Sequence, residues 1–200
     1  MKNDGFMKKL ILYGDSNTYG HDPERMGMRY PEDVRWASLV ARELKGEYEV
    51  INEGMNGRPL PVFPYDERYL KSMLSELGSN DILLMMLGTN DILLTNRPNA
   101  DTAIEKMAAF LSSPVIESRA FHLIIIAPPY VGAGEKSMHR YYEESIRMNE
   151  GFQRLCVEKR IHFADASKWN IPIAYDQAHF TAKGHQLFSK CILREIQYLA

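Results

Sequence analysis

Residues 8–17 read KKLILYGDSN, an apolar run that ends in a small polar turn. Runs of this kind are typical of a parallel strand that is buried on both faces. The following residues soon become helical in pattern, which puts Ser16 at the carboxyl edge of a sheet and near the first amides of a helix. A developing oxyanion is stabilised at such a position. Ser and Asp are also common helix caps, so this stretch alone leaves a purely structural role open.

Apolar runs alternate with amphipathic stretches along the whole sequence. We expect strands at residues 8–13, 48–52, 81–87, 122–127 and 161–165. We expect helices at residues 32–45, 65–77, 100–118, 138–159 and 181–198. The third and fourth strands, DILLMML and HLIIIA, are almost wholly apolar, as strands covered on both faces are. The pattern predicts an α/β fold, a three-layer α/β/α sandwich around a five-stranded parallel, flavodoxin-like sheet.

Bulk composition fits one globular domain over residues 1–200, with residues 1–6 expected to be a flexible tail. No repeat, low-complexity tract or linker divides the sequence. The formal net charge is only -2, and Lys and Arg are scattered, so we expect no nucleic-acid partner. No apolar run approaches the length of a transmembrane helix, so we expect no membrane partner. Cys156 and Cys191 fall in expected helices and are expected to be buried, reduced thiols, which favours a cytoplasmic location.

Polar motifs follow the expected strands at their carboxyl ends, where open parallel sheets bind ligands. After the second strand, residues 52–58 read NEGMNGR, and the glycines allow close backbone approach to an anion. After the third strand, residues 88–91 read GTND, and the Asn90 side chain is a suitable oxyanion donor. Taken singly, the first motif is also compatible with a flexible connection and the second with a turn.

A carboxylate stands three residues before an imidazole in Asp176-Gln177-Ala178-His179. In a helical turn or a tight loop these two side chains lie together, so Asp176 can orient His179 as a general base for Ser16. A serine hydroxyl needs such a base to act as a nucleophile. A surface ion pair is the structural alternative. No further His or Cys stands at ligand spacing, so we expect no metal site.

Taken together and in order, Gly14-Asp15-Ser16, Gly57, Gly88-Thr89-Asn90-Asp91 and Asp176-x-x-His179 resemble the four signature blocks of SGNH (GDSL-type) hydrolases. Within that family the motifs look most like the arylesterase and acyltransferase branch, with acetyl-xylan esterases as near neighbours. Asn17 stands where the family name has leucine. Pro59 stands where the arylesterase branch often has threonine, which puts the shape of the acyl pocket in doubt.

The resemblance implies a catalytic triad of Ser16, Asp176 and His179. It also implies an oxyanion hole made by the Ser16 and Gly57 amides and the Asn90 side chain. The implied activity is hydrolysis of short-chain esters, acetyl esters foremost, through an acyl-enzyme, with a small-molecule ester as substrate and no cofactor. A homo-oligomer is a further expectation from the same branch.

Several neighbouring residues are candidates for supporting the site or binding substrate: Asp15, Asn17, Arg58, Asp91 and Tyr130. We expect Asp15 and Asp91 to be structural, whereas Arg58 is expected to meet either a substrate carboxylate or Glu53. Tyr130 begins a glycine-bearing loop, residues 130–138, that we expect to form a wall of the substrate pocket.

Three alternatives stay open at this point. One is an acyltransferase or carbohydrate deacetylase that uses the same triad. Another is a flavodoxin-like module that binds flavin or phosphate, although neither Gly-x-Gly-x-x-Gly nor Gly-x₄-Gly-Lys-Ser/Thr is present. The third is a catalytically inactive relative that binds a carbohydrate or a protein partner.

Overall fold

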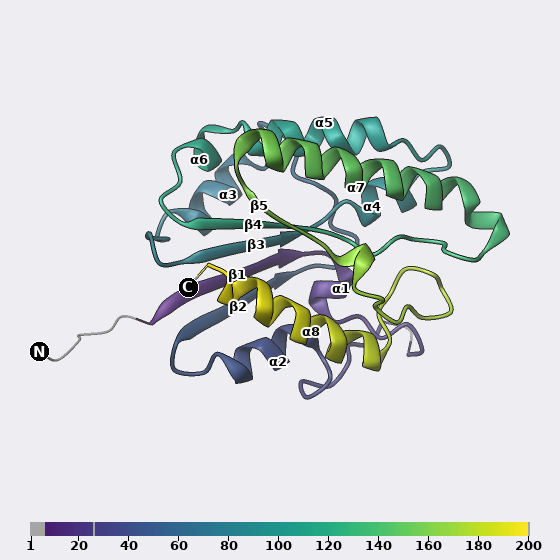
Figure 1. Ribbon diagram of the computed structural model, residues 1–200, viewed down its shortest axis with the longest axis horizontal. Coiled ribbons are helices and arrows are strands. Elements are labelled where there is room, and N and C mark those ends of the chain that lie inside the picture. The colour runs from purple at the N-terminus through teal and green to yellow at the C-terminus, as the bar shows by residue number, and fades with distance from the viewer. Residues whose placement is uncertain (1–6, 26, 200) are drawn as a thin grey trace, which may run out of the picture.

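The computed structural model of the protein describes residues 7–25 and 27–199 (Figure 1). The expected tail, residues 1–6, lies outside the described residues. Five strands run through the described part of the chain: β1 (Lys8–Gly14), β2 (Tyr48–Gly54), β3 (Ile82–Met86), β4 (His122–Ala127) and β5 (His162–Asp165). The α-helices there are α1 (Ser16–Tyr19), α2 (Trp36–Glu43), α3 (Glu67–Leu74), α4 (Thr89–Leu93), α5 (Ala100–Leu111), α6 (Pro114–Glu117), α7 (His139–Lys159) and α8 (Ala182–Gln197). Two short 3₁₀ helices, η1 (Lys136–Met138) and η2 (Ala166–Lys168), complete the set.

The strands form one parallel sheet in the order β2-β1-β3-β4-β5. This is the flavodoxin-like order, and it confirms the fold expected from the sequence. At the carboxyl end of β1, Gly14 is in register with Gly54 of β2 and with Met86 of β3. The loops that follow these three strands therefore begin side by side.

Helices cover both faces of the sheet, so the molecule has three layers (Figure 1). One face carries α3, α5 and α7, and the other carries α2 and α8. Successive side chains of a strand point to opposite faces. In β1, Ile11 and Tyr13 accordingly join one hydrophobic cluster, whereas Leu10 and Leu12 join the other. Because both faces are covered, the central strands need apolar residues at consecutive positions.

Trp36 belongs to the core, as expected for a tryptophan on the apolar face of a helix. It is fully buried in the cluster between the sheet and α2 and α8, and its ring lies edge-on to Phe188 at 4.9 Å. Its indole nitrogen donates to the carbonyl of Asn17 at 2.9 Å. The core is therefore tied directly to the turn that follows β1.

The single helix expected over residues 100–118 is wrong. Two helices, α5 and α6, occupy this stretch and are separated by Ser112 and Ser113. Pro114 is the cause, because a proline disfavours helical geometry in the residue before it. Ser113 has φ -70° and ψ 146°, and Pro114 opens α6. The expected helix over residues 32–45 also begins later, at Trp36.

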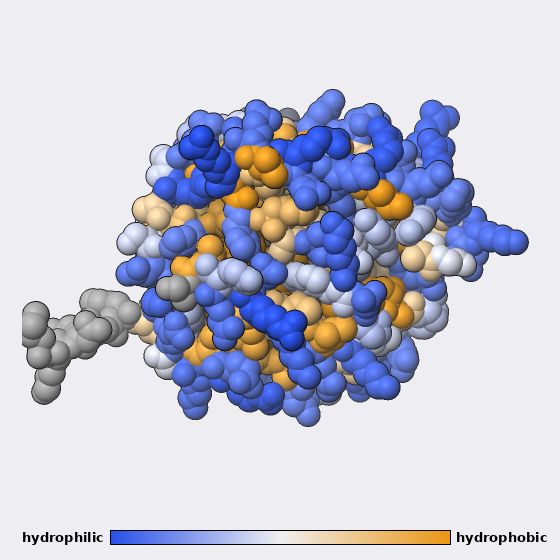
Figure 2. Space-filling model, viewed as in Figure 1, coloured by the Kyte–Doolittle hydropathy of each residue, from blue (hydrophilic) through white to orange (hydrophobic). Residues whose placement is uncertain are grey.

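Polar side chains cover most of the face shown in Figure 2, and apolar ones form small separate groups. None of the described helices is long and apolar enough to cross a membrane. Of the two cysteines, Cys156 is buried as expected, but Cys191 is half-buried. Both are free thiols.

Candidate active site

The candidate residues gather at the carboxyl edge of the sheet, around the junction of β1 and β3. Strand order reverses direction there, since β2 lies on one side of β1 and β3 on the other. Crevices of this kind are where open α/β sheets bind ligands. Ser16 opens α1 directly after β1, and Asn90 is the second residue of α4 after β3. His179 lies in the loop that leads into α8.

Ser16, His179 and Asp176 form a continuous line of hydrogen bonds. The Ser16 Oγ lies 2.9 Å from Nε2 of His179, and Nδ1 of His179 lies 2.6 Å from Oδ2 of Asp176. An ionised carboxylate only accepts hydrogen bonds, so the Nδ1–H group of His179 donates the hydrogen bond to Asp176. In the neutral ring, Nε2 is then free to accept the Ser16 proton. The side chains of His179 and Asp176 are 23% and 27% exposed, so the line of contacts is open to small molecules.

A tight turn holds the Asp176 carboxylate under the ring of His179. Its Oδ1 accepts from the amides of Ala178, at 3.1 Å, and His179, at 3.0 Å. Gln177 takes a left-handed conformation, with φ 61°, which closes the turn. Burial alone would raise the pKa of Asp176, but the hydrogen bonds from His179 and Ala178 outweigh it and hold that pKa below its ordinary value. The lowered pKa favours the ionised form of Asp176, which is the form that accepts a hydrogen bond from His179.

Asp15 caps α1, as the sequence predicts. Its Oδ1 accepts from the amide of Asn17 at 2.9 Å, whereas its Oδ2 is buried and has no hydrogen-bond partner among the described residues. Burial raises the pKa of Asp15 to about 6, against the opposing effect of the Asn17 amide. The charged form of this carboxyl, one residue away from Ser16, is costly to bury, and the raised pKa reflects that cost.

The Gly57 loop and Asn90 lie next to each other. Nδ2 of Asn90 donates to the carbonyl of Arg58, the residue after Gly57, at 3.0 Å. One N–H of the Asn90 amide remains after this bond. Gly57 has φ 73°, and no atom lies within 4 Å of the position where a Cβ would stand. The amide of Met55 in the same loop donates to Gly14 at 3.1 Å, which ties the loop to the end of β1.

Arg58 supports this loop from within. Its guanidinium lies over the ring of Tyr13 at 4.4 Å and donates to the carbonyls of Gly14 and Glu53. The expected partnership with Glu53 therefore involves its backbone, because the Glu53 carboxylate instead accepts from the hydroxyl of Tyr69 at 2.7 Å. Only 8% of Arg58 is exposed. A hollow of about 380 Å³ opens beside it and is also lined by Tyr13, Met55, Asp66 and Tyr69.

The carboxylate of Asp91, which we expected to be structural, makes its contacts within the fold. It pairs with Lys106 of α5 at 2.7 Å and accepts from the amide of Leu60 at 2.8 Å. The side chain of Asp91 is 2% exposed. It therefore joins α4, α5 and the loop after Gly57.

Tyr130 and the loop that follows it lie against the turn that carries His179. The ring of Tyr130 meets that of Tyr142 of α7 edge-on at 5.6 Å. The amide of Gly132 donates to the carbonyl of Gln177 at 3.1 Å. A hollow of about 350 Å³ lies beside this loop, lined in part by Gly132, Glu135 and Tyr142. Nothing in the sequence pointed to the Gly132–Gln177 contact, because backbone groups of two loops make it.

Two histidines near the site differ in role. His21 packs its ring 4.5 Å from that of His179, and burial, followed by the charge of His179, lowers its pKa. His185 is fully buried in α8, and its pKa is lowered to about 3 by burial. Its Nδ1 lies 3.4 Å from the amide of Trp36, in accord with the structural role expected for it.

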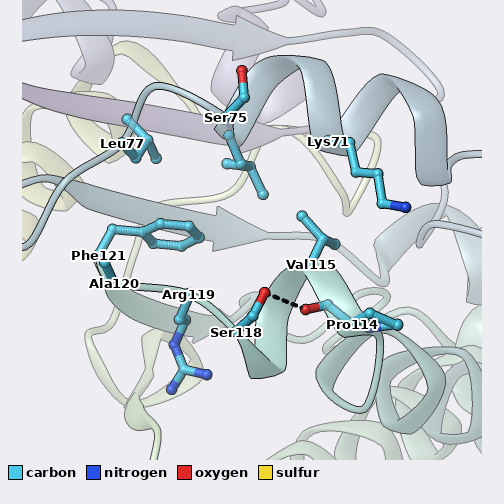
Figure 3. A pocket seen from close by; sticks show the side chains of 10 residues that line it. Lys71, Ser75, Leu77, Pro114, Val115, Ser118, Arg119, Ala120 and Phe121 are labelled. Atoms are coloured by element: carbon cyan, nitrogen blue, oxygen red, sulfur yellow. Dashed lines mark hydrogen bonds between the residues drawn. The ribbon is translucent and has the colours of Figure 1, made fainter.

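Another hollow, of about 390 Å³, lies at the opposite edge of the sheet (Figure 3). Leu77 and Phe121, which precede β3 and β4, line it together with Lys71 and Arg119. Leu77 and Phe121 lie before the amino ends of these strands, whereas Ser16 follows the carboxyl end of β1. This hollow is therefore not part of the candidate active site.

Among residues 7–25 and 27–199, no group of three or more His, Cys, Asp and Glu side chains is placed to hold a metal ion.

A model of the GDSL-like lipase/acylhydrolase family matches residues 12–187. No curated protein sequence matches the chain. A solved structure provisionally named an arylesterase, from Agrobacterium tumefaciens str. C58, is 28% identical, covers 97% of this chain and 100% of its own, and has a TM-score of 0.78. The aryl esterase of M. smegmatis is 23% identical over 96% of this chain and 100% of its own, with a TM-score of 0.77. Est24, a carbohydrate acetylesterase from Sinorhizobium meliloti, is 22% identical over 96% and 100%, with a TM-score of 0.75.

Proposed function

Since the chain belongs to the GDSL-like lipase/acylhydrolase family, and is thus an SGNH-type serine hydrolase, we propose that it hydrolyses short-chain esters through an acyl-enzyme on Ser16. The single observation that carries this proposal is the line of contacts from Ser16 Oγ through His179 to Asp176, at 2.9 and 2.6 Å. These distances support the assignment of Ser16 as nucleophile, His179 as general base and Asp176 as the carboxylate that orients it.

In the first step, Ser16 Oγ attacks the ester carbonyl carbon while its proton passes to Nε2 of His179. The imidazolium is stabilised by Asp176 and then gives the proton to the leaving alkoxide as the ester C–O bond breaks. In the second step, water attacks the acyl carbon while His179 takes its proton, and His179 then returns the proton to Ser16 Oγ as the bond between the acyl carbon and Oγ breaks and the acid departs. An alcohol in place of water makes the same enzyme an acyltransferase.

We assign the oxyanion hole to the Ser16 amide, the Gly57 amide and the Asn90 side chain. The contact between Asn90 and Arg58 supports this assignment, because it brings the side-chain donor next to the Gly57 loop. Donors that are fixed before the reaction stabilise the developing charge without reorganising. Arg58 and Asp91 hold the loop and Asn90 through the contacts described above.

Acetyl esters are the substrates we favour. The His179 and Asp176 side chains are about a quarter exposed, and an open site of this kind suits a short acyl group. Names of similar proteins point to two alcohol classes, since one is an aryl esterase and another a carbohydrate acetylesterase. A module that binds flavin or phosphate is a weaker proposal, because it gives the Ser16–His179–Asp176 contacts no role.

Replacement of the triad tests the mechanism. We expect Ser16→Ala and His179→Ala each to lower kcat/KM for p-nitrophenyl acetate by about 10⁴-fold or more, and the double variant to be little worse. A fluorophosphonate probe should label the natural protein on Ser16 and leave Ser16→Ala unlabelled. Ser118→Ala, at the exposed opposite edge of the sheet, is the matched control and should retain full activity. Hydrolysis that survives Ser16→Ala would refute the proposal.

The acyl preference has its own test. We expect p-nitrophenyl acetate to be hydrolysed with a higher kcat/KM than the octanoate ester, and acetylated sugars are to be compared with aryl acetates in the same assay. A preference for the octanoate ester would contradict the proposed short acyl chain, and leave the triad assignment intact.

A further inference from the structure

The side chain of Asn17 holds the backbone on both sides of His179. Its Nδ2 donates to the carbonyl of Ala178 at 3.1 Å, and its Oδ1 accepts from the amide of Phe180 at 2.9 Å. Asn17 is only 4% exposed, so these bonds are shielded from water. The side-chain amide thus pairs with the loop in the way that a neighbouring strand would, and His179 is the residue between the two bonds.

The backbone of Asn17 is fixed as firmly as its side chain. Its amide donates to Asp15 Oδ1 at 2.9 Å, and its carbonyl accepts from the indole of Trp36 at 2.9 Å. Trp36 is fully buried in the core. The backbone and side-chain polar groups of Asn17 are therefore paired. Through Asn17, the loop of His179 is connected to the buried core that contains Trp36.

The loop has further anchors, but each acts from one side. The carbonyl of His179 accepts from the amide of Ala174 at 2.7 Å, and the ring of Phe180 is fully buried against Phe188. None of these contacts reaches the turn that carries the nucleophile. Asn17 alone in this set joins that turn to the loop, and it directly follows Ser16 in the chain.

We propose that Asn17 is a positioning residue that sets the His179 imidazole against the Ser16 hydroxyl; this inference rests on the proposed function. Only a side chain with one donor and one acceptor in a planar amide satisfies both Ala178 and Phe180. A leucine, which names the GDSL motif, satisfies neither. The asparagine of the Gly-Asp-Ser-Asn sequence therefore positions His179 through the backbone of Ala178 and Phe180.

The test compares Asn17→Leu, Asn17→Asp and the control Asn149→Leu. Asn149 is also buried, at 3% exposure, and its side chain donates to the carbonyl of Pro128 at 2.8 Å rather than to the residues beside His179. Each variant is assayed for kcat and KM with p-nitrophenyl acetate, for the rate of fluorophosphonate labelling, and for thermal unfolding. Activities are expressed per folded protein, so that a loss of stability alone does not lower them.

For Asn17→Leu we expect kcat and the labelling rate to fall by about 10- to 100-fold with KM changed by less than about 3-fold, because small displacements of a catalytic group carry penalties of this size. Asn17→Asp keeps the acceptor for the Phe180 amide, so its loss should be smaller. Asn149→Leu should unfold at a lower temperature and yet keep its labelling rate. A fall in kcat and labelling rate per folded protein, with KM little changed and with no such fall in Asn149→Leu, is the result that a merely structural role does not produce.

Two outcomes overturn the inference: full kcat in Asn17→Leu, or an equal loss in Asn149→Leu. If Asn17→Leu does not fold, Asn17→Asp decides the matter, since a labelling rate equal to that of the natural protein would then overturn it. The two proposals fail separately. Activity that survives Ser16→Ala defeats the proposed function, whereas an inactive Ser16→Ala beside a fully active Asn17→Leu defeats only the role of Asn17.

Discussion

Asn90 is the proposed side-chain donor of the oxyanion hole, and its replacement tests that role. We expect Asn90→Ala to lower kcat by about 10²- to 10³-fold and to change KM little, because an oxyanion donor acts mainly when negative charge develops on the carbonyl oxygen. Steady-state kinetics with p-nitrophenyl acetate measure both constants. A fall in kcat of less than about 3-fold would contradict the assignment of Asn90 to the oxyanion hole.

The raised pKa of Asp15 predicts an unusual dependence of the free energy of unfolding on pH. Its pKa rises from 3.8 to about 6 on folding, because burial disfavours the charged carboxylate. Between these values the unfolded chain has lost the proton and the folded protein keeps it, so the free energy of unfolding falls as the pH rises through this window.

Asp15→Asn removes this titration. The variant should therefore gain stability relative to the natural protein from about pH 4 to pH 6 and keep the gain above pH 6, by up to about 3 kcal/mol for a shift of two pKa units. Urea unfolding at pH 4, 5, 6 and 7 measures the difference. A difference that is constant across these values would show that Asp15 does not titrate as its burial indicates.

At the residue scale, the sequence identified Ser16, Asp176 and His179 because they stand in recognisable blocks at strand ends. The structure brings these three together, and their catalytic roles stay a proposal. Glu53 was an expected partner of Arg58, but the contacts to the backbone carbonyls of Glu53 and Gly14 were not predictable, since backbone carbonyls leave no mark in a sequence. The grip of Asn17 on the residues beside His179 was hidden for the same reason, although Asn17 itself was a candidate.

At the scale of elements, the end of β2 approaches α1 so closely that a side chain does not fit. A Cβ on Gly54 would lie 2.2 Å from the amide nitrogen of Tyr19. We expect Gly54→Ala to lower the free energy of unfolding by about 1–3 kcal/mol, as overpacking does, and to reduce activity through displacement of α1.

Gly78→Ala is the matched control for this prediction. A Cβ there has only Asp81 Oδ2 near it, at 3.8 Å, which is an ordinary contact. Urea unfolding of both variants measures the difference. Equal stabilities of the two variants would mean that β2 and α1 separate easily.

The elements themselves were predictable where one period dominates. The apolar runs of β3 and β4 identify strands covered on both faces, and both lie where expected. Helix ends were less predictable because they depend on local rules that compete with amphipathic periodicity. At Pro114 the restriction on the preceding residue outweighs a helical pattern that continues through it, and one expected helix becomes two.

At the scale of the whole molecule, the sheet has a buried centre and more exposed edges. Every side chain of β3 is buried, whereas only Tyr48 in β2 and Ala164 in β5 are buried. We expect backbone amides of β3 and β4 to exchange with solvent only through global unfolding, and those of β2 and β5 to exchange faster. Hydrogen exchange in increasing urea measures this order. Equal protection of β2 and β3 would contradict it.

The parallel, flavodoxin-like architecture was predictable because strands and helices alternate throughout the sequence, and this alternation permits few other arrangements. Self-association and cellular location stay predictions. Neither depends on the contacts that build this fold, so the packing of one chain does not test them.

Ser16 and His179, the proposed nucleophile and its base, are 163 residues apart in the chain. During synthesis, Ser16 leaves the ribosome long before His179. Until His179 follows, the Ser16 hydroxyl has no base to activate it. In the proposed mechanism, turnover begins only when the loop that carries His179 docks onto the turn that carries Ser16. If Ser16 and His179 act as proposed, the rate at which refolding protein reacts with a fluorophosphonate reports the closing stage of folding.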